Sequence, residues 1–177
     1  MRTKDIKKRI KEHFFLHPTE KLRVRQIERE LNASLPSVIR YAKELEKEGM
    51  LKVSIIGGAK LYSADRSSPK FILEKKLFNI ASLYSSGLVD YIRDEYGLPT
   101  TIVFGSYARG EDLEDSDIDI YIECGIKEEK DLTAFEKKLE RKIHLLKYKN
   151  LASVENKGLA NNIINGFVLS GFVEVFK

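Results

Sequence analysis

The sequence has one cysteine, no tryptophan and only four prolines in 177 residues. A single cysteine, Cys124, excludes an intramolecular disulfide and fits the reducing cytoplasm. We interpret Cys124 as a small apolar strand residue rather than a nucleophile. The N-terminus has no apolar signal region, and the most apolar run, 163–176, is too short and too interrupted to span a membrane. We therefore expect a cytoplasmic protein without a membrane partner.

The formal charge of +4 is unevenly distributed along the chain. Residues 1–66 contain 16 Lys and Arg against 9 Asp and Glu, whereas residues 67–177 contain 15 against 18. This difference indicates a basic module that meets a polyanion and an acidic module that meets metal. Chance variation in surface charge is the alternative, which the sum alone does not exclude.

The basic part shows a succession of short helical and strand patterns. Apolar residues recur at helical spacing from residue 3 to 17, where Pro18 ends the pattern. Ser34 is a candidate N-cap, with Pro36 in the first turn of the helix that follows. His13 and His17 have a metal-ligand spacing, but ordinary helix residues explain them better. The expected elements are a helix at 3–17, a strand at 22–24, helices at 25–31 and 34–48, and a hairpin of 51–56 with 59–63 around Gly57-Gly58.

This order resembles the winged helix-turn-helix regulators of bacteria and archaea. The resemblance implies that the third helix enters the major groove of double-stranded DNA by its N-terminal part. The implied DNA-binding residues of this helix and the hairpin are Ser34, Ser37, Arg40, Tyr41, Lys43, Lys52 and Lys60. The alternative is a winged helix that serves protein docking or dimerisation. In that case the Lys and Arg residues only solvate the surface.

A polar segment, 64–69, marks the expected boundary between two domains. We expect residues 1–66 to form the winged helix-turn-helix, residues 67–84 a linker helix that could carry a homodimer contact, and residues 85–177 a second domain. Within and before the second domain we expect helices at 71–83, 88–96, 128–140 and 154–164, strands at 100–104, 117–123 and 142–148, and a helix end or strand at 167–176. The fold class is therefore α+β, with a small mixed sheet and helices on its face.

The most specific signal lies in the second domain, between residues 105 and 120. A β-branched run, 100–104, is followed by Gly105-Ser106, and ten residues separate Ser106 from Asp117. Because strand residues two apart share a face, the carboxylates of Asp117 and Asp119 project side by side, where they need a cation between them. Mg²⁺ takes one or two carboxylates and completes its coordination with water and substrate phosphates. The glycine turn supplies donors suited to phosphate oxygens.

This pattern resembles the signature of the DNA polymerase β-like nucleotidyltransferase superfamily. The string from Gly105 to Asp119, Gly-Ser-x-Ala-Arg-Gly followed by Ser-Asp-Ile-Asp, looks most like its minimal nucleotidyltransferase branch. The resemblance implies that Gly105 and Ser106 bind the triphosphate of an NTP, with ATP as the expected nucleotide. It also implies that Asp117 and Asp119 are catalytic and bind Mg²⁺ or Mn²⁺. We interpret Arg109 as a cation for phosphate or for bracing the motif.

One part of the superfamily pattern is missing. The superfamily usually has a third carboxylate on the strand after the helix, but here that strand is 142–147 and carries no acid. Its residue on the expected face is His144. Histidine ordinarily titrates near neutral pH and could act as the catalytic base, although an ordinary strand residue is an equal alternative. Glu123 lies about 13 Å along the strand from Asp119, too far to share a metal ion.

Two functions follow. In the first, the protein transfers a nucleoside monophosphate from an NTP with Mg²⁺ to an acceptor hydroxyl, on a partner protein or on a small molecule. In the second, it is a DNA-binding transcriptional regulator whose nucleotidyltransferase-like domain senses nucleotide or dimerises. The glycine turn and the Asp pair favour the enzyme, whereas the missing carboxylate and the winged helix favour the regulator.

Overall fold

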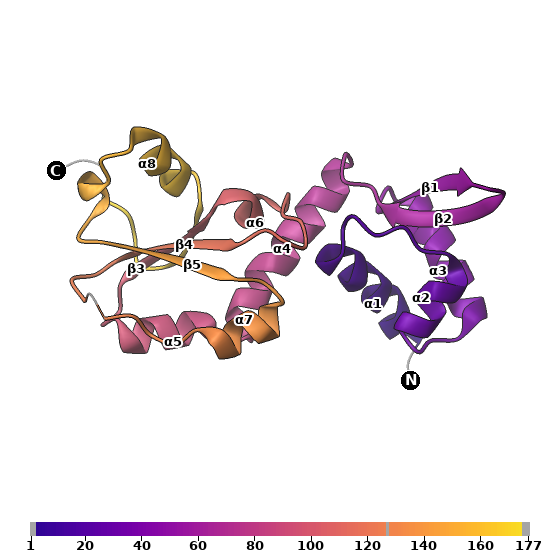
Figure 1. The fold of residues 1–177 in the computed structure, drawn as a ribbon, viewed down its shortest axis with the longest axis horizontal. Helices are drawn as coiled ribbons and strands as arrows, with labels where there is room; N and C mark the ends of the chain where they lie inside the picture. Colours follow the sequence, from indigo (N-terminus) through magenta and orange to yellow (C-terminus); the bar gives the residue numbers. More distant parts are fainter. Residues whose placement is uncertain (1–2, 127, 175–177) are drawn as a thin grey trace. The chain divides into compact units, whose positions relative to one another are not determined.

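The computed structural model describes residues 3–126 and 128–174. The chain separates into two compact units, Met1–Lys75 and Lys76–Lys177, and the division falls inside one helix, α4 (Pro69–Ser85). Figure 1 shows the elements of both units along the chain. No helix in the described ranges has the length and apolar character that crossing a bilayer requires.

The first unit begins with three helices and a two-stranded antiparallel hairpin (Figure 1). Its helices pack around a core of fully buried side chains from every one of these elements. The elements are α1 (Thr3–Leu16), α2 (Val24–Glu30), α3 (Leu35–Lys47), β1 (Leu51–Ile56) and β2 (Ala59–Ala64). The central core residues are Ile10, Phe14, Ile27, Val38, Ala42, Leu45, Met50, Leu51 and Tyr62. This core gives the first unit its own hydrophobic centre.

Local sequence explains the boundaries of α3 and of the hairpin. Ser34 is the N-cap of α3, and Pro36 lies in its first turn, where the missing N–H has no intrahelical partner to lose. Gly57 and Gly58 join the paired residues Ile56 and Ala59, and both glycines have positive φ, +54° and +74°. Such a two-residue turn matches the twist of the flanking strands, so the expected hairpin is confirmed.

The prediction of a strand at 22–24 in the first unit is wrong. The segment 22–24 forms only a single bridge, between Leu22 and Tyr62 of β2, with Leu22 N–H donating to the Tyr62 carbonyl at 2.9 Å. Val24 already belongs to α2, where the Arg23 N–H donates to the Gln26 side chain at 2.9 Å. That contact begins the helix at the point where the sequence pattern predicts a strand.

The second unit is an α+β domain built on a mixed four-stranded sheet. Its strands have the order β5-β4-β3-β6, in which β4 and β5 are parallel and the other pairs are antiparallel. The elements are α5 (Leu88–Glu95), β3 (Thr100–Phe104), α6 (Gly105–Arg109), β4 (Ile118–Glu123), α7 (Thr133–Leu139), β5 (Ile143–Tyr148), the 3₁₀ turn η1 (Leu151–Ser153), α8 (Lys157–Ile164) and β6 (Phe167–Ser170).

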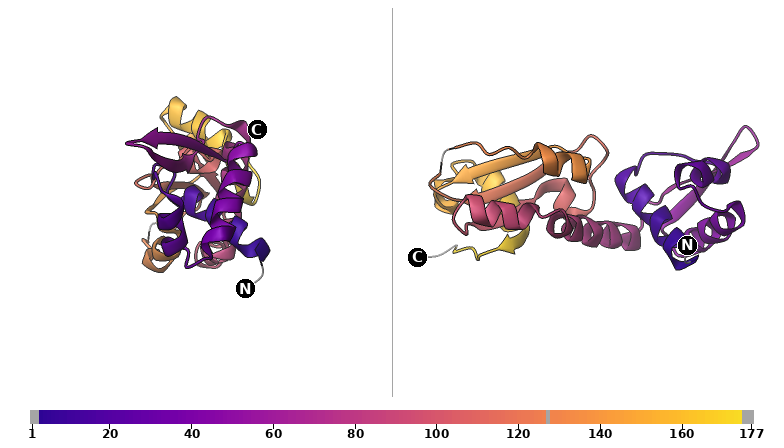
Figure 2. Two further views of the ribbon diagram at one scale, coloured as in Figure 1. Left: turned by 90° about the vertical axis from the view of Figure 1, so that its right-hand side faces the viewer. Right: turned by 90° about the horizontal axis from the view of Figure 1, so that it is seen from below.

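Helices cover both faces of this sheet. Figure 1 shows α5 and α7 along one face and α8 along the other, and Figure 2 gives two further views. On the first face, Ile118 and Ile120 of β4 pack with side chains of α4, α5 and α7. On the second face, Tyr121 packs with Ile163 of α8. The side chains of β4 therefore alternate between the two faces, as the sequence predicts, and Asp119 lies on the face away from Ile118.

Two expected helices of the second unit are longer in the prediction than in the structure. The helix expected at 128–140 occupies only Thr133–Leu139, because the Asp131 side chain accepts a hydrogen bond from the Thr133 N–H at 2.9 Å and starts the helix there. The helix expected at 154–164 begins at Lys157, after Asn156 caps it through the Leu159 N–H. The C-terminal segment forms the strand β6 at Phe167–Ser170, while the expected residues 175–176 lie outside the described ranges.

Candidate functional site

The turn between β3 and α6 brings the backbone of Gly105 against the carboxylate of Asp119. Gly105 has a φ of +74°, a conformation that residues with a Cβ rarely adopt. A Cβ at this position would lie 2.6 Å from Asp119 Oδ2. The register agrees, because Phe104 of β3 pairs with Asp119 of β4. Only glycine permits this approach, so the glycine turn and the first strand carboxylate form one compact group.

His144 lies on the other side of Asp119. The parallel register of β4 and β5 pairs these two residues, and His144 Nδ1 lies 3.2 Å from Asp119 Oδ1. The Asp119 side chain is 31% exposed and the His144 side chain 58% exposed, so both are reachable from solvent. An ionised carboxylate only accepts hydrogen bonds, so a hydrogen bond in this contact uses the tautomer with the proton on Nδ1. In that tautomer of the neutral imidazole, Nε2 carries the lone pair.

Asp117 precedes the first residue of β4 and is exposed. Among the residues that the structure describes, its carboxylate makes no hydrogen bond or ion pair. The neighbouring backbone is fixed, because the Ile118 N–H donates to the Lys142 carbonyl at 2.8 Å. Asp117 is thus a free carboxylate on a well-anchored strand end.

The two remaining motif residues have different surroundings. Ser106 lies in α6, half-buried, and its carbonyl accepts a hydrogen bond from the Glu111 N–H at 3.0 Å. Arg109 is 53% exposed and pairs through Nε with Glu111 at 2.7 Å. The structure therefore brings Gly105 and Asp119 together, with Ser106 next to Gly105 in the chain, but holds the Arg109 guanidinium in an exposed ion pair.

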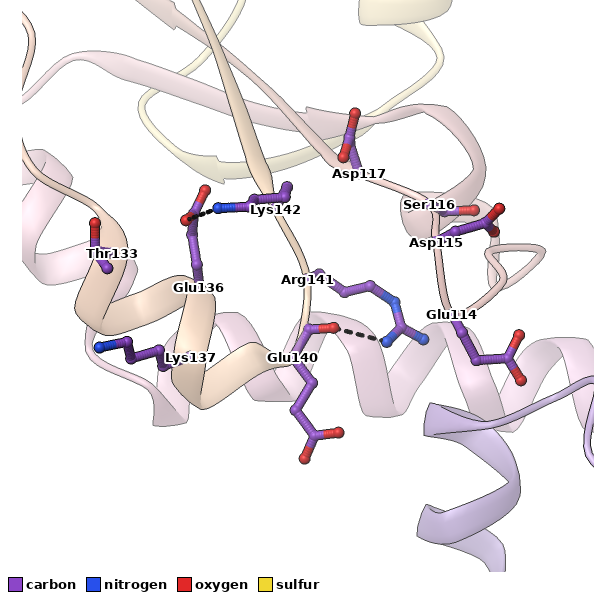
Figure 3. A pocket seen from close by; sticks show the side chains of 10 residues that line it. All are labelled: Glu114, Asp115, Ser116, Asp117, Thr133, Glu136, Lys137, Glu140, Arg141 and Lys142. Atoms are coloured by element: carbon purple, nitrogen blue, oxygen red, sulfur yellow. Dashed lines mark hydrogen bonds and ion pairs between the residues drawn. The ribbon is translucent and has the colours of Figure 1, made fainter.

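A pocket of about 350 Å³ adjoins this site on the side of Asp117 (Figure 3). It lies between the segment 114–117 and α7, and it contains five acidic and three basic side chains. One acid is already paired, because Lys142 Nζ lies 2.9 Å from Glu136 Oε2. The lining residues are Glu114, Asp115, Ser116, Asp117, Thr133, Glu136, Lys137, Glu140, Arg141 and Lys142. None of Gly105, Asp119 and His144 lines this pocket, and Asp117 is its one member among the sequence-predicted site residues.

Sequence reasoning missed a buried polar network beneath the motif. The Asp112 carboxylate is 1% exposed, accepts from Asn79 Nδ2 at 2.7 Å and lies 3.5 Å from the Arg141 guanidinium. Asn79 Nδ2 also donates to the Tyr107 carbonyl at 2.8 Å. Burial raises the pKa of Tyr107 well above its ordinary value, and the nearby Asp112 carboxylate adds to the effect. The only signal of this network in the sequence is the acidic residue Asp112 inside the motif loop. Its partners Asn79 and Arg141 lie far from it along the chain.

The donor set fits a divalent cation in part. Within the described ranges, no group of three or more His, Cys, Asp or Glu side chains is arranged to hold a metal ion. Asp119 and the uncommitted carboxylate of Asp117 are hard oxygen ligands, which suit Mg²⁺ when water and substrate phosphates complete its shell. The Gly105 backbone lies so close to Asp119 that a Cβ there would be 2.6 Å from Asp119 Oδ2, so a phosphate held by the turn would lie beside this carboxylate. The residues present therefore fit a metal that arrives with its nucleotide.

Glu123 has a structural role at the far end of β4. It accepts hydrogen bonds from the Tyr121 hydroxyl at 2.9 Å and from the Leu151 N–H at 3.1 Å. Burial, followed by the hydrogen bond to Glu123, raises the pKa of Tyr121. These contacts agree with its exclusion from the metal site.

The residues expected to bind DNA have unequal exposure in the first unit. Tyr41 is 7% exposed and belongs to the core, with its hydroxyl accepting a hydrogen bond from Arg40. The Arg40 guanidinium lies over the Tyr41 ring, 4.3 Å from its centre. Lys60 pairs with Glu46 at 3.2 Å. The exposed members of the expected set are Ser34, Arg40, Lys43, Lys52 and Lys60, and Ser37 is half-buried.

Comparison with known families supports the assignment of the second unit. Residues 86–169 match the family model described as nucleotidyltransferase domain, which supports the nucleotidyltransferase superfamily for this part of the chain. Domains of this kind generally use an NTP substrate and a divalent metal ion. No curated protein and no solved structure matches the chain.

Proposed function

We propose that the second unit transfers a nucleoside monophosphate from an NTP, with ATP as the expected nucleotide, to an acceptor hydroxyl. The observation that carries the proposal is the group formed by Gly105, Asp119 and His144, in which the backbone of a glycine turn, a carboxylate and an imidazole meet. The nucleotidyltransferase match over residues 86–169 suggests NTP-dependent transfer and supports the same reaction class.

The roles follow from the chemistry of each residue. Backbone N–H groups at the start of α6, with the Ser106 hydroxyl, donate to triphosphate oxygens, because the first N–H groups of a helix have no intrahelical acceptor. Asp117 and Asp119 bind the Mg²⁺ or Mn²⁺ that accompanies the nucleotide. This cation supplies charge neutralisation at the phosphates and a template for their orientation.

Transfer exchanges a phosphoanhydride bond of the NTP for a phosphate ester bond to the acceptor. The acceptor oxygen forms a bond to the α-phosphorus, and the bond from that phosphorus to the bridging oxygen breaks, releasing pyrophosphate. The acceptor hydroxyl loses its proton, which His144 Nε2 accepts while Asp119 holds the ring through Nδ1–H. The acceptor is a hydroxyl of a partner protein or of a small molecule.

The test is label transfer from each common ribonucleoside triphosphate, labelled on the α-phosphate, to components of a cell extract with Mg²⁺. We expect the parent protein to label one component and Asp119→Asn, which keeps the shape but removes the charge, to label none. Calorimetry with ATP should show the matching loss of Mg²⁺-dependent binding. Equal binding of Mg²⁺ and ATP by Asp119→Asn and the parent would make the site assignment wrong.

We further propose that the first unit is a winged helix-turn-helix that binds double-stranded DNA. The order of α1, α2, α3 and the β1–β2 hairpin supports this, as do the exposed cations on α3 and both strands. The incomplete ligand set around Asp119 favours a second candidate, a transcriptional regulator whose second unit binds nucleotide without transfer. Nucleotide binding without any labelled product, together with DNA binding, is the result expected of that regulator.

A further inference from the structure

The Asp112 network consists of Asn79, Tyr107, Asp112 and Arg141, and none of its members belongs to the proposed metal or phosphate site. All four are nearly excluded from solvent, with exposed fractions of 2%, 4%, 1% and 6% in that order. A charged pair this deeply buried carries a large desolvation cost, and its contribution to stability is correspondingly small. Its retention beside a catalytic motif therefore calls for a second explanation.

On one side, the network fixes the strand end that carries Asp117. Arg141 holds the Asp112 carboxylate, and the next residue in the chain, Lys142, accepts a hydrogen bond from the Ile118 N–H at 2.8 Å. The chain from Asp112 to Ile118 is thus attached at both of its ends to the same short segment, 141–142. Figure 3 shows the Arg141 guanidinium pointing from this segment towards residues 114–117. Asp117 lies immediately before the second attachment.

The loop between these attachments is itself closed. The Leu113 N–H donates to the Ser116 side chain at 2.9 Å, and the Ser116 N–H donates to the Leu113 carbonyl at 3.2 Å. Few degrees of freedom are therefore left between Asp112 and Asp117. A displacement of the Asp112 carboxylate would move the strand end with it.

On the other side, the network fixes α6. The Asn79 amide donates both to Asp112 and to the carbonyl of Tyr107, which lies two residues after Gly105. The Tyr107 hydroxyl returns a hydrogen bond to the Asn79 carbonyl at 3.4 Å. One buried carboxylate therefore connects the phosphate-binding turn to the metal-binding strand end.

We infer that Asp112 is a positioning residue, which with Arg141 and Asn79 sets the carboxylate of Asp117 at a fixed place relative to the Gly105–Ser106 turn. The inference rests on the proposed function, because it gives the network a purpose in metal-dependent nucleotide binding. A metal shared between Asp117 and a phosphate on the turn requires both groups at one separation, and ligand-orienting partners typically contribute about 10- to 100-fold to metal affinity.

The test compares ATP binding with Mg²⁺ and with a chelator, by calorimetry, in the whole chain. Asp112→Asn alone leaves the buried Arg141 charge unpaired, so the main variant is Asp112→Asn with Arg141→Gln, which removes both charges at once. We expect metal-free ATP affinity to stay at the parental value while the gain in affinity from Mg²⁺ falls about tenfold or more. A merely structural role would lower both affinities together through the folded fraction.

Two further variants keep the result interpretable. Asn79→Leu retains the Asp112–Arg141 ion pair and removes the two hydrogen bonds of the amide, to Asp112 and to the Tyr107 carbonyl. It serves if the double variant does not fold, and the same selective loss of Mg²⁺-dependent ATP affinity is expected. Tyr121→Phe is the matched control, because it removes a buried hydroxyl contact of β4 on the opposite face. In Tyr121→Phe, Mg²⁺ should raise the ATP affinity as much as it does in the parent. If Mg²⁺ raises the ATP affinity of the double variant and of Asn79→Leu as much as it does in the parent, the inference is overturned.

Amide hydrogen exchange separates this inference from the proposed function. We expect the Ile118 amide to exchange faster in the double variant, while amides of the β1–β2 hairpin keep their parental rates. If the parent itself binds no ATP with Mg²⁺, the proposed metal-dependent reaction is wrong. Amide hydrogen exchange alone then tests whether the Asp112 network holds the strand end at Ile118. Unchanged Ile118 exchange in the double variant would overturn the positioning role in that case also.

Discussion

The contact between His144 Nδ1 and Asp119 Oδ1 bears on the proposed proton transfer from the acceptor hydroxyl to His144 Nε2. In the neutral tautomer that donates from Nδ1 to Asp119, Nε2 carries the lone pair on the other side of the ring. A base in this state can take the proton of an incoming hydroxyl. The superfamily pattern leads us to expect a carboxylate at this place, and we propose that His144 serves there as a base instead of a metal ligand.

Substitution of His144 distinguishes a base from a structural residue. We expect His144→Ala to keep parental ATP binding and to lower transfer about 10²- to 10⁴-fold, which is the usual contribution of a positioned base. We expect His144→Asp to supply a third carboxylate and to raise basal transfer or hydrolysis. Turnover is measured as pyrophosphate release with saturating ATP and Mg²⁺. Parental turnover in both variants would show that the acceptor or a partner supplies the base.

At this scale the sequence predicted neighbours that lie at fixed spacing and missed those that do not. The alternation of β4 and the position of His144 follow from the period of two in a strand. The partners of Asp112 do not follow, because Asn79 and Arg141 come from a helix and a strand entry far away in sequence. No local pattern encodes a buried ion pair that only tertiary packing creates.

The turn from β3 into α6 shows how an element boundary can carry the chemistry. The sequence predicts that Gly105 ends the strand, but it does not predict the five-residue helix that follows or the closeness to Asp119. Gly97 has nearly the same backbone conformation, with φ of +72°, yet an added Cβ would meet nothing within 4 Å there. A comparison of the two glycines therefore distinguishes the effect of backbone strain from the effect of a steric clash with Asp119.

Alanine substitution at the two glycines tests this separation. Both Gly105→Ala and Gly97→Ala should lower the free energy of unfolding by about 1–2 kcal/mol, because each places a Cβ in a left-handed conformation. Only Gly105→Ala should abolish Mg²⁺-dependent ATP binding, since its Cβ displaces the Asp119 carboxylate. Denaturant unfolding and calorimetry measure the two effects. Retained ATP binding by Gly105→Ala would disconnect the turn from the site.

The errors at element scale have a common cause. The prediction extends helices back to residues 128 and 154, because apolar spacing continues past the true starts. Asp131 and Asn156 end that continuation by accepting backbone hydrogen bonds, so side-chain capping overrides the periodic pattern. The strands of the sheet were easier to place, since β-branched runs and alternation both mark them.

At the scale of the whole molecule, the charge difference along the chain has a structural counterpart. The part with the excess of basic residues forms the first unit, whose α3 and hairpin expose Arg40, Lys43, Lys52 and Lys60. The part with the acidic excess forms the unit that contains Asp117 and Asp119. The two proposed activities therefore rest on residues of different units.

Duplex DNA binding by the whole chain should depend steeply on salt. Each phosphate contact by Lys or Arg releases condensed counterions, so about four contacts predict a slope of log K against log salt of about −3.6. Lys60→Ala should reduce the slope by about 1 and weaken all sequences alike, whereas Arg40→Ala should relax sequence preference. Fluorescence anisotropy over a range of salt concentrations measures both quantities, with duplexes that include the region upstream of the gene.

Lys8→Ala is the control for this experiment, because Lys8 is an exposed cation of the same unit, 71% exposed, on α1 rather than on α3 or the hairpin. It removes the same net charge as Lys60→Ala but should leave the slope near its parental value. An equal change for both variants would indicate that DNA responds only to net charge, without a defined surface. Absence of salt-dependent binding to every duplex would leave protein docking as the role of the first unit, and nucleotide binding by the second unit should then be unaffected by DNA.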